Sequence, residues 1–206
     1  MKKFIGTLLL IVIAGFGIYA TTGLKNNNVK KEIPPVPVQI SAHNITITKD
    51  IQEEKIPGIP QRIRIPAINI NTNVESVGVT GPNRKMEVPK NASNGGWYNL
   101  GAKPGEKGSA VIAGHYDKKD SSPAIFWNLN KLTLGDKIII ADSQGIERTF
   151  AVIKTVKYPY NEFPLQQVFG DSSEPLLNLI TCQGSWNTGT RNYSHRLVVY
   201  AKYVKG

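Results

Sequence analysis

Hydrophobic residues in most of this chain come in short runs that Gly, Pro and Asn interrupt. The runs are rich in Ile and Val, which is typical of short β-strands. We predict strands at Arg62–Ile65, Ile68–Val74, Gly108–His115, Asp136–Asp142, Arg148–Tyr158, Leu176–Cys182 and His195–Val204, with a further short one at Met86–Val88. Only Pro123–Leu132 predicts a helical turn or two. So many short strands around one core favour a closed barrel, because closure removes exposed strand edges.

The first residues follow a different pattern. Lys2 and Lys3 precede the stretch Phe4–Ala20, which is apolar and has no charged residue. Its length is close to the ~20 residues that span a bilayer, and no clear signal-peptidase site follows it. The sequence therefore predicts a single-pass transmembrane anchor over residues 1–23 with the lysines in the cytoplasm. A cleaved signal peptide is the alternative, and in both cases the rest of the chain works outside the cytoplasm.

Between this anchor and the first strand, the sequence disfavours regular structure. Asn26–Asn28 and the prolines Pro34, Pro35 and Pro37 favour extended conformers. We therefore predict an extended tether over residues 24–59 and one domain over residues 60–206.

Composition and charge limit which binding partners, metals and cofactors we expect. The chain has 25 basic and 15 acidic residues, and its formal net charge is +10. No basic helix or RNA-binding signature accompanies this charge, so we expect no nucleic acid and instead an anionic membrane or cell wall as neighbour. A single cysteine excludes an internal disulfide and a multi-cysteine zinc site. Three histidines leave little material for another metal site, so the sequence predicts no metal and no cofactor.

Three polar residues stand at strand ends. Cys182 and His115 each end an apolar strand, and Arg196 opens the last one. If the last two strands pair as a hairpin, Cys182 and Arg196 lie opposite each other, and a parallel neighbour would bring His115 to the same rim. A thiolate nucleophile, a proton donor for a departing amine and an oxyanion donor together suit acyl transfer. Spacing alone also allows a small buried thiol, a turn histidine and a surface charge.

Longer strings around these residues resemble a known family. Leu179–Cys182, followed after a loop by Arg196–Ala201, resembles the signature of sortases, and Ala113–His115 resembles the sortase segment that carries the histidine. The resemblance spans residues 60–206 in order, with further matches at Arg64–Ile70, Gly95–Tyr98 and Pro104–Ala110. The Gly-Trp-Tyr, Pro-Gly-Glu and Thr-Cys-x-Gly strings look most like class F, with classes D and E next.

The resemblance implies an all-β fold, an eight-stranded sortase-type β-barrel with one or two short helices, behind an amino-terminal anchor and tether. It also implies a cysteine transpeptidase of the cell membrane whose catalytic domain is extracellular. Such enzymes cut an LPXTG-like sorting signal between Thr and Gly through a thioacyl-enzyme. They then transfer the protein to an amine on a cell-wall precursor or another surface acceptor.

Carried over by position, Cys182 is the nucleophile, His115 the general acid and base, and Arg196 the oxyanion and substrate-orienting group. The resemblance further implies that the cleft is lined by Ala113, Ile180 and Thr181. The connection Tyr158–Glu174 falls where sortases grip the Leu-Pro end of the signal.

Alternatives remain for residues and for function. Arg191 is an alternative to Arg196 as the catalytic arginine, but only Arg196 directly precedes the apolar run. His195 is an alternative to His115 as the catalytic histidine, but only the Ala-Gly-His string of His115 matches the family. Asp117 either orients His115 or is a solvated loop charge. An L,D-transpeptidase would need a Ser-His-Gly-Cys motif, which is absent. The alternative from another class is a membrane-tethered β-barrel binding module in which Cys182 is structural.

Overall fold

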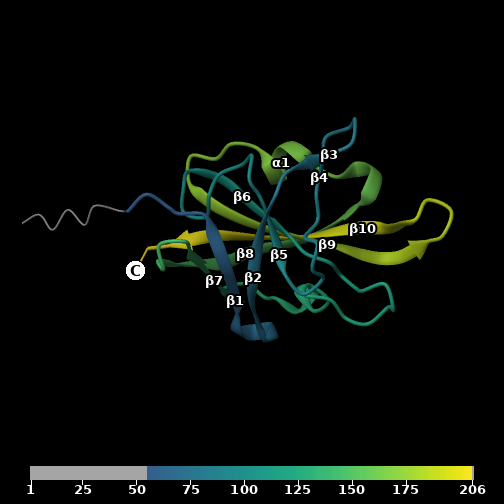
Figure 1. Ribbon diagram of the computed structural model, residues 1–206, viewed down its shortest axis with the longest axis horizontal. Helices are drawn as coiled ribbons and strands as arrows, with labels where there is room; N and C mark the ends of the chain where they lie inside the picture. The colour runs from purple at the N-terminus through teal and green to yellow at the C-terminus, as the bar shows by residue number, and fades with distance from the viewer. Residues whose placement is uncertain (1–54, 206) are drawn as a thin grey trace, which may run out of the picture. The chain divides into compact units, whose positions relative to one another are not determined.

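The computed structural model describes residues 55–205, in which eight strands close a barrel (Figure 1). They are β1 (Pro60–Ile65), β2 (Ile70–Val77), β5 (Gly95–Tyr98), β6 (Gly108–Ala113), β7 (Lys137–Asp142), β8 (Glu147–Pro159), β9 (Pro175–Asn187) and β10 (Asn192–Val204). Their order around the barrel is β1-β2-β5-β6-β9-β10-β8-β7, and two short strands, β3 (Val79–Thr80) and β4 (Lys85–Met86), form a separate sheet. The predicted eight-stranded β-barrel is confirmed.

Two of the barrel pairings are parallel, β2 with β5 and β6 with β9. The remaining neighbours are antiparallel. The parallel pair β6 and β9 matters for function, because it brings the ends of two strands that are distant in sequence to the same rim.

The helices differ from the prediction. They are short: η1 (Pro66–Ile68), η2 (Leu129–Lys131), η3 (Tyr160–Glu162) and α1 (Leu165–Phe169). The predicted turn at Pro123–Leu132 is reduced to η2, whereas η3 and α1 lie in the connection Tyr158–Glu174. Five residues between Pro164 and Gly170 are too few for a helical hydrophobic period to show in the sequence.

Several strand boundaries also differ. The strands β9 and β10 run beyond Cys182 as a paired ribbon to Asn187 and Asn192, which Figure 1 shows as the projecting yellow hairpin. This ribbon has mostly exposed residues, so no apolar run marks it in the sequence. The strand β5 was not predicted, since two of its four residues are glycines. The strand that holds Ala113 ends there, two residues before His115.

Alternating side chains of β6, β9 and β10 divide between two hydrophobic clusters. The larger cluster fills the barrel and includes Ile112, Leu179 and Val199. The smaller one lies on the outside, where α1 covers it, and consists of Val111, Val168, Ile180, Val198 and Tyr200. Cys182 follows Ile180 by two residues and therefore faces the outside of the barrel.

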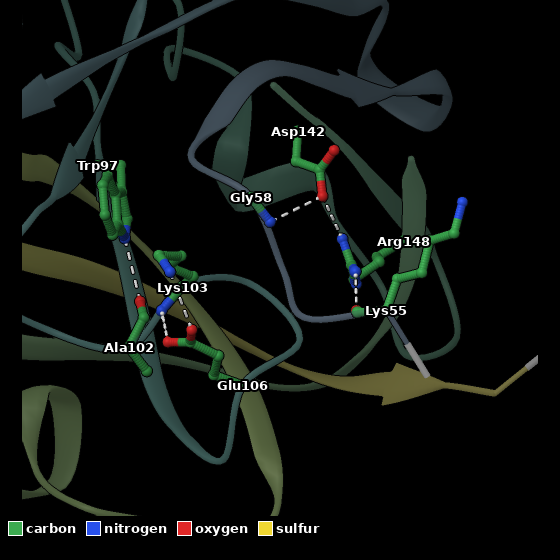
Figure 2. Close-up of polar contacts among 8 residues, drawn as sticks. All are labelled: Lys55, Gly58, Trp97, Ala102, Lys103, Glu106, Asp142 and Arg148. Atoms are coloured by element: carbon green, nitrogen blue, oxygen red, sulfur yellow. Dashed lines mark hydrogen bonds and ion pairs between the residues drawn. The ribbon is translucent and has the colours of Figure 1, made fainter. Parts of the chain in front are cut away.

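The described end of the predicted tether, residues 55–59, is held at the barrel by a buried ion pair (Figure 2). Arg148 Nη1 lies 2.6 Å from Asp142 Oδ2, and both residues are 5% exposed. The backbone N–H of Gly58 donates to the same carboxylate oxygen at 3.0 Å, and Arg148 Nη2 donates to the carbonyl of Lys55 at 2.8 Å. These contacts fix the path of the chain into β1.

The predicted anchor at residues 1–23 and the tether up to residue 54 lie outside the described residues. Over residues 55–205, no helix is long and apolar enough to span a membrane. The domain boundaries given above therefore stay predictions.

We expect Asp142→Asn to destabilise the domain by about 3–5 kcal/mol, because it leaves the Arg148 guanidinium buried without a countercharge. Burial raises the pKa of the Asp142 carboxyl, but hydrogen bonds from Gly58, Arg148 and the turn after β7 outweigh it and hold the pKa below its ordinary value. A lowered folded-state pKa stabilises above the unfolded pKa of about 3.9, and this contribution is lost as pH falls through the folded pKa.

Urea denaturation at pH 7 and pH 3 measures both effects. The gap between wild type and Asp142→Asn should shrink at pH 3. Glu147→Gln is the matched control, since its ion pair with Arg64 is exposed and contributes at most about 1 kcal/mol. Equal losses in the two variants would contradict the prediction.

Candidate active site

A groove of ≈ 750 Å³ lies on the outer face of β6, β9 and β10. One wall is built by residues 83–88, around β4, and the other by residues between 160 and 170, which include α1. Its floor is formed by Ala113, Ile180, Cys182 and Arg196. The groove is thus partly apolar, and the only cysteine of the chain lies on its floor.

Strand register places Cys182 and Arg196 directly opposite each other. Their Cα atoms are partners in the antiparallel pairing of β9 with β10, as predicted, and side chains at directly opposed positions leave the sheet on the same face. Both side chains line the groove, and Cys182 is half-buried. The thiol and the guanidinium therefore share the floor of the groove.

The electrostatics of Cys182 favour the neutral thiol. Burial raises the pKa of the Cys182 thiol, the positive charge of Arg196 lowers it and the negative charge of Asp117 raises it, with the net pKa above the ordinary value. At neutral pH the free protein therefore holds mostly thiol. Because the thiolate is the nucleophile, attack requires a base that removes this proton.

Arg196 is held in place on several sides. Its Nη2 donates to Asn192 Oδ1 at 2.6 Å and its Nη1 donates to the carbonyl of His195 at 3.0 Å. The guanidinium also lies over the ring of Tyr160, 4.8 Å from its centroid. An arginine has five N–H donors, so these contacts orient the guanidinium and still leave N–H groups for a ligand in the groove.

The parallel pairing of β6 with β9 brings the segment of His115 to the same rim of the barrel as Cys182. Ala113 and Ile180 are register partners, and the N–H of Gly114 donates to the carbonyl of Ile180 at 3.0 Å. His115 follows Gly114 directly, at the same rim of the barrel as Cys182, but it does not itself line the groove. Gly114 allows this path, because a Cβ there would collide with the buried ring of Phe126.

The His115 ring has a defined tautomer. Its Nε2 lies 3.1 Å from the carbonyl oxygen of Pro89. A carbonyl only accepts, so Nε2 carries the proton and Nδ1 is the unprotonated nitrogen of the neutral ring. Nδ1 is therefore the atom that can take up a proton. In residues 55–205, no hydrogen bond joins His115 to Cys182 or Arg196.

A carboxylate on β2 holds the segment that contacts His115. Glu75 accepts hydrogen bonds from the N–H groups of Lys90 at 2.9 Å and Asn91 at 3.2 Å, and from Asn94 Nδ2 at 2.9 Å. Although burial raises the pKa of Glu75, these hydrogen bonds hold it below the ordinary value. Glu75 thereby fixes the carbonyl of Pro89 against the histidine ring.

The placement of the other predicted residues is mixed. Ala113 and Ile180 line the groove, as expected. Thr181 does not, and this part of the prediction is corrected. Thr181 alternates with Ile180 and Cys182 along β9 and so faces inward, where it is 2% exposed. Its hydroxyl donates to the carbonyl of Gly114 at 2.9 Å, so Thr181 supports the segment before His115.

The competing residues lie elsewhere. Arg191 is exposed at the tip of the β9–β10 hairpin, with φ of 52°. His195 precedes Arg196 and so leaves the strand on the other face, with Nδ1 2.8 Å from Ser194 Oγ. Asp117 accepts a hydrogen bond from the Tyr193 hydroxyl rather than from His115.

Sequence reasoning missed the residues that support the site. Tyr160, Asn192, Pro89 and Glu75 hold Arg196 and His115, but none belongs to a motif with a fixed spacing from them. Three of them lie outside the strands or at a strand end, where strand periodicity carries no signal. Among the described residues, no group of three or more His, Cys, Asp or Glu side chains is arranged to hold a metal ion.

Comparisons with known proteins point to one family. The sortase domain family matches residues 63–204. The fold is similar to that of sortase C1 of GBS Pilus Island 1, with 21% identity, a TM-score of 0.53 and coverage of 71% of this chain and 65% of that chain. It is also similar to sortase C-1 from Actinomyces oris, with 22% identity, a TM-score of 0.54 and coverage of 71% and 72%.

A third similar structure is sortase A from Corynebacterium diphtheriae, with 23% identity, a TM-score of 0.53 and coverage of 73% of this chain and 62% of that chain. The chain thus spans slightly less than two thirds of the first and third of these structures. At such identities the likeness concerns the fold. No curated protein sequence matches the chain.

Proposed function

The chain belongs to the sortase family, and from this premise we propose that it is a cysteine transpeptidase that cleaves an LPXTG-like sorting signal between Thr and Gly. The observation that carries the proposal is the pairing of Cys182 with Arg196 at the floor of a groove, with His115 two residues beyond the end of the parallel strand β6 that pairs with β9. We also propose that the protein is a class F sortase, with classes D and E as the next alternatives, because its sequence motifs resemble those of class F.

In the first half-reaction, His115 takes the proton of the Cys182 thiol, and the sulfur attacks the carbonyl carbon of the Thr residue. Arg196 hydrogen-bonds the oxyanion of the tetrahedral intermediate. The C–N bond then breaks, and the imidazolium of His115 returns its proton to the departing amine. The product is a thioester between the Thr residue and Cys182.

In the second half-reaction, an amine of a cell-wall precursor or another surface acceptor attacks the thioester carbon. The C–S bond breaks, an amide forms, and the proton that the amine nitrogen loses passes through His115 to the departing sulfur, which restores the Cys182 thiol for the next cycle. The protein upstream of the cut is thereby joined to the acceptor.

The groove suits the apolar start of such a signal. Its walls include Met86, Val88, Phe163, Leu165 and Phe169, which offer apolar surface to a Leu-Pro pair. Phe163, Leu165 and Phe169 belong to the connection between β8 and β9, and Asn178 Nδ2 ties this connection to β9 through the carbonyl of Val168 at 2.7 Å. We place the Leu-Pro end of the signal along this wall.

The amino-terminal sequence supports a proposal for where the protein acts. An apolar stretch at residues 4–20 after two lysines supports a single-pass anchor in the cell membrane with the catalytic domain outside the cell. Surface proteins that carry a sorting signal would meet the enzyme there.

Incubation of the full-length protein in detergent with LPXTG-like peptides tests the function. Mass spectrometry should find cleavage after Thr and, in the quenched protein, the mass of the acyl group on Cys182. Absence of both products over a peptide library would overturn the proposal and favour the binding module with a structural cysteine.

A further inference from the structure

Four aromatic rings form a connected row beside the groove. The ring of Tyr116 stacks on Trp127 with centroids 4.4 Å apart and meets Tyr193 edge-on at 5.5 Å. Tyr193 in turn meets Trp186 at 5.2 Å. The row joins the loop after His115 to the β9–β10 ribbon, and none of the four residues lines the groove. It is therefore a second surface, separate from the lining of the groove.

One carboxylate lies in contact with this row. Asp117 is half-buried and accepts a hydrogen bond at Oδ2 from the Tyr193 hydroxyl. Burial and this hydrogen bond raise the pKa of Tyr193, so the phenol stays a neutral donor. In the described part of the chain, Oδ1 of Asp117 has no hydrogen bond and the carboxylate forms no ion pair, although Lys118 and Lys119 follow it as exposed residues.

Asp117 is also connected to the catalytic residues. Tyr193, which donates to it, accepts a hydrogen bond at its carbonyl oxygen from Arg196 Nη1 at 3.4 Å. Arg196 is the register partner of Cys182, and the negative charge of Asp117 raises the pKa of the Cys182 thiol. A ligand at Asp117 would therefore lie at the same rim of the barrel as an acyl group on Cys182. A half-buried carboxylate without a cation in the described chain, in contact with a hydroxyl of a row of aromatic rings, has the chemistry that attracts an alkylammonium ion.

Resting on the function proposed above, we infer that Asp117, together with the rings of Tyr116 and Tyr193, binds the primary ammonium group of the amine acceptor. The exposed ring of Trp186, 53% accessible, extends this site along the acceptor chain. The groove thus receives the sorting signal, and the aromatic row receives the nucleophile that resolves the thioester.

During transfer, each proton that leaves the bound amine has an acceptor at this site. The bound ammonium gives one proton to the neutral His115 ring, and the free amine attacks the thioester carbon. The C–N bond forms, the C–S bond breaks, and the second nitrogen proton goes to the departing sulfur. The proton on His115 is released to solvent. By holding the amine next to the thioester, the site raises its effective concentration against water.

The partition between transfer and hydrolysis tests this inference. Full-length protein in detergent is given an LPXTG-like peptide and triglycine, and the amounts of ligated and hydrolysed peptide are measured over a range of triglycine concentrations. Both products come from the same thioester, so any effect of Asp117 on the reactivity of the Cys182 thiol cancels in their ratio.

We expect Asp117→Asn to lower the ratio of ligated to hydrolysed peptide about tenfold at low triglycine, through a higher KM for the amine. Transfer to hydroxylamine, which is uncharged at neutral pH, should fall much less. The control is Asp120→Asn on the same loop, whose carboxylate bonds only to Ser122 and is exposed. Its ratio should stay within about twofold of wild type.

A ratio in Asp117→Asn within about twofold of wild type, with hydrolysis proceeding, overturns the inference and leaves the proposed function standing. Equal losses with triglycine and hydroxylamine also overturn it, because they indicate a structural effect instead of recognition of charge. If the wild-type protein forms neither product with any peptide, the proposed function itself fails.

Discussion

We expect the Cys182→Ala variant to lose peptide cleavage and acyl-enzyme formation completely while it keeps the wild-type fold. The chain has no other cysteine that could substitute, and acyl transfer without the sulfur has no covalent intermediate. The fold should persist because Cys182 is only half-buried, at the groove floor and outside both hydrophobic clusters. Removal of the sulfur therefore leaves no enclosed core cavity.

Peptide turnover and the mass of the quenched protein measure this result, and thermal unfolding checks the fold. Ser185→Ala is a suitable control, since this exposed residue lies on the same strand outside the groove. Turnover by Cys182→Ala above the background of peptide alone would show that another residue performs the attack.

The arrangement of Cys182 and Arg196 could be predicted because it depends on local pairing. Two apolar strands separated by a polar loop favour an antiparallel hairpin, and the hairpin fixes which residues oppose each other. To bring His115 to the same rim as Cys182, the prediction needed one more assumption, namely that the strand before His115 lies parallel to the strand that ends at Cys182. The parallel pairing of β6 with β9 meets this assumption.

The error at Thr181 has a simple physical cause. A residue next to the nucleophile in sequence was expected next to it in the cleft, but side chains of a strand alternate between faces. The same alternation correctly places Ala113 and Ile180 on the groove floor. Along a strand, an even number of residues from Cys182 therefore predicts that a side chain lines the cleft better than closeness in sequence does.

The supporting contacts could not be predicted, since they join segments without regular structure. Tyr160 reaches Arg196 from η3, and Pro89 reaches His115 from the segment before β5. The bond of Tyr193 to Asp117 likewise connects a strand end to a loop. Such contacts depend on how loops fold over the barrel, and neither hydrophobic period nor turn residues encode that path.

The second large effect concerns the arginine. We expect Arg196→Lys to lower kcat at least about 10²–10³-fold, which is the usual effect of losing one oxyanion donor, with a smaller change in KM. A lysine keeps the charge but lacks the planar fork of N–H groups. It could not donate to Asn192 and the carbonyl of His195 while it stacks on Tyr160, as the guanidinium does.

Arg191→Lys is the matched control and should stay within roughly tenfold of wild type. Arg191 lies at the exposed hairpin tip, where no ring or carboxylate of the described chain contacts its guanidinium, whereas an oxyanion donor must keep a fixed position. Measurement of kcat and KM for both variants with one cleaved peptide separates the two arginines. The opposite result would be a large loss of kcat in Arg191→Lys and a nearly unchanged kcat in Arg196→Lys. It would mean that the guanidinium opposite Cys182 is structural and that the hairpin tip folds over the substrate to supply the oxyanion donor.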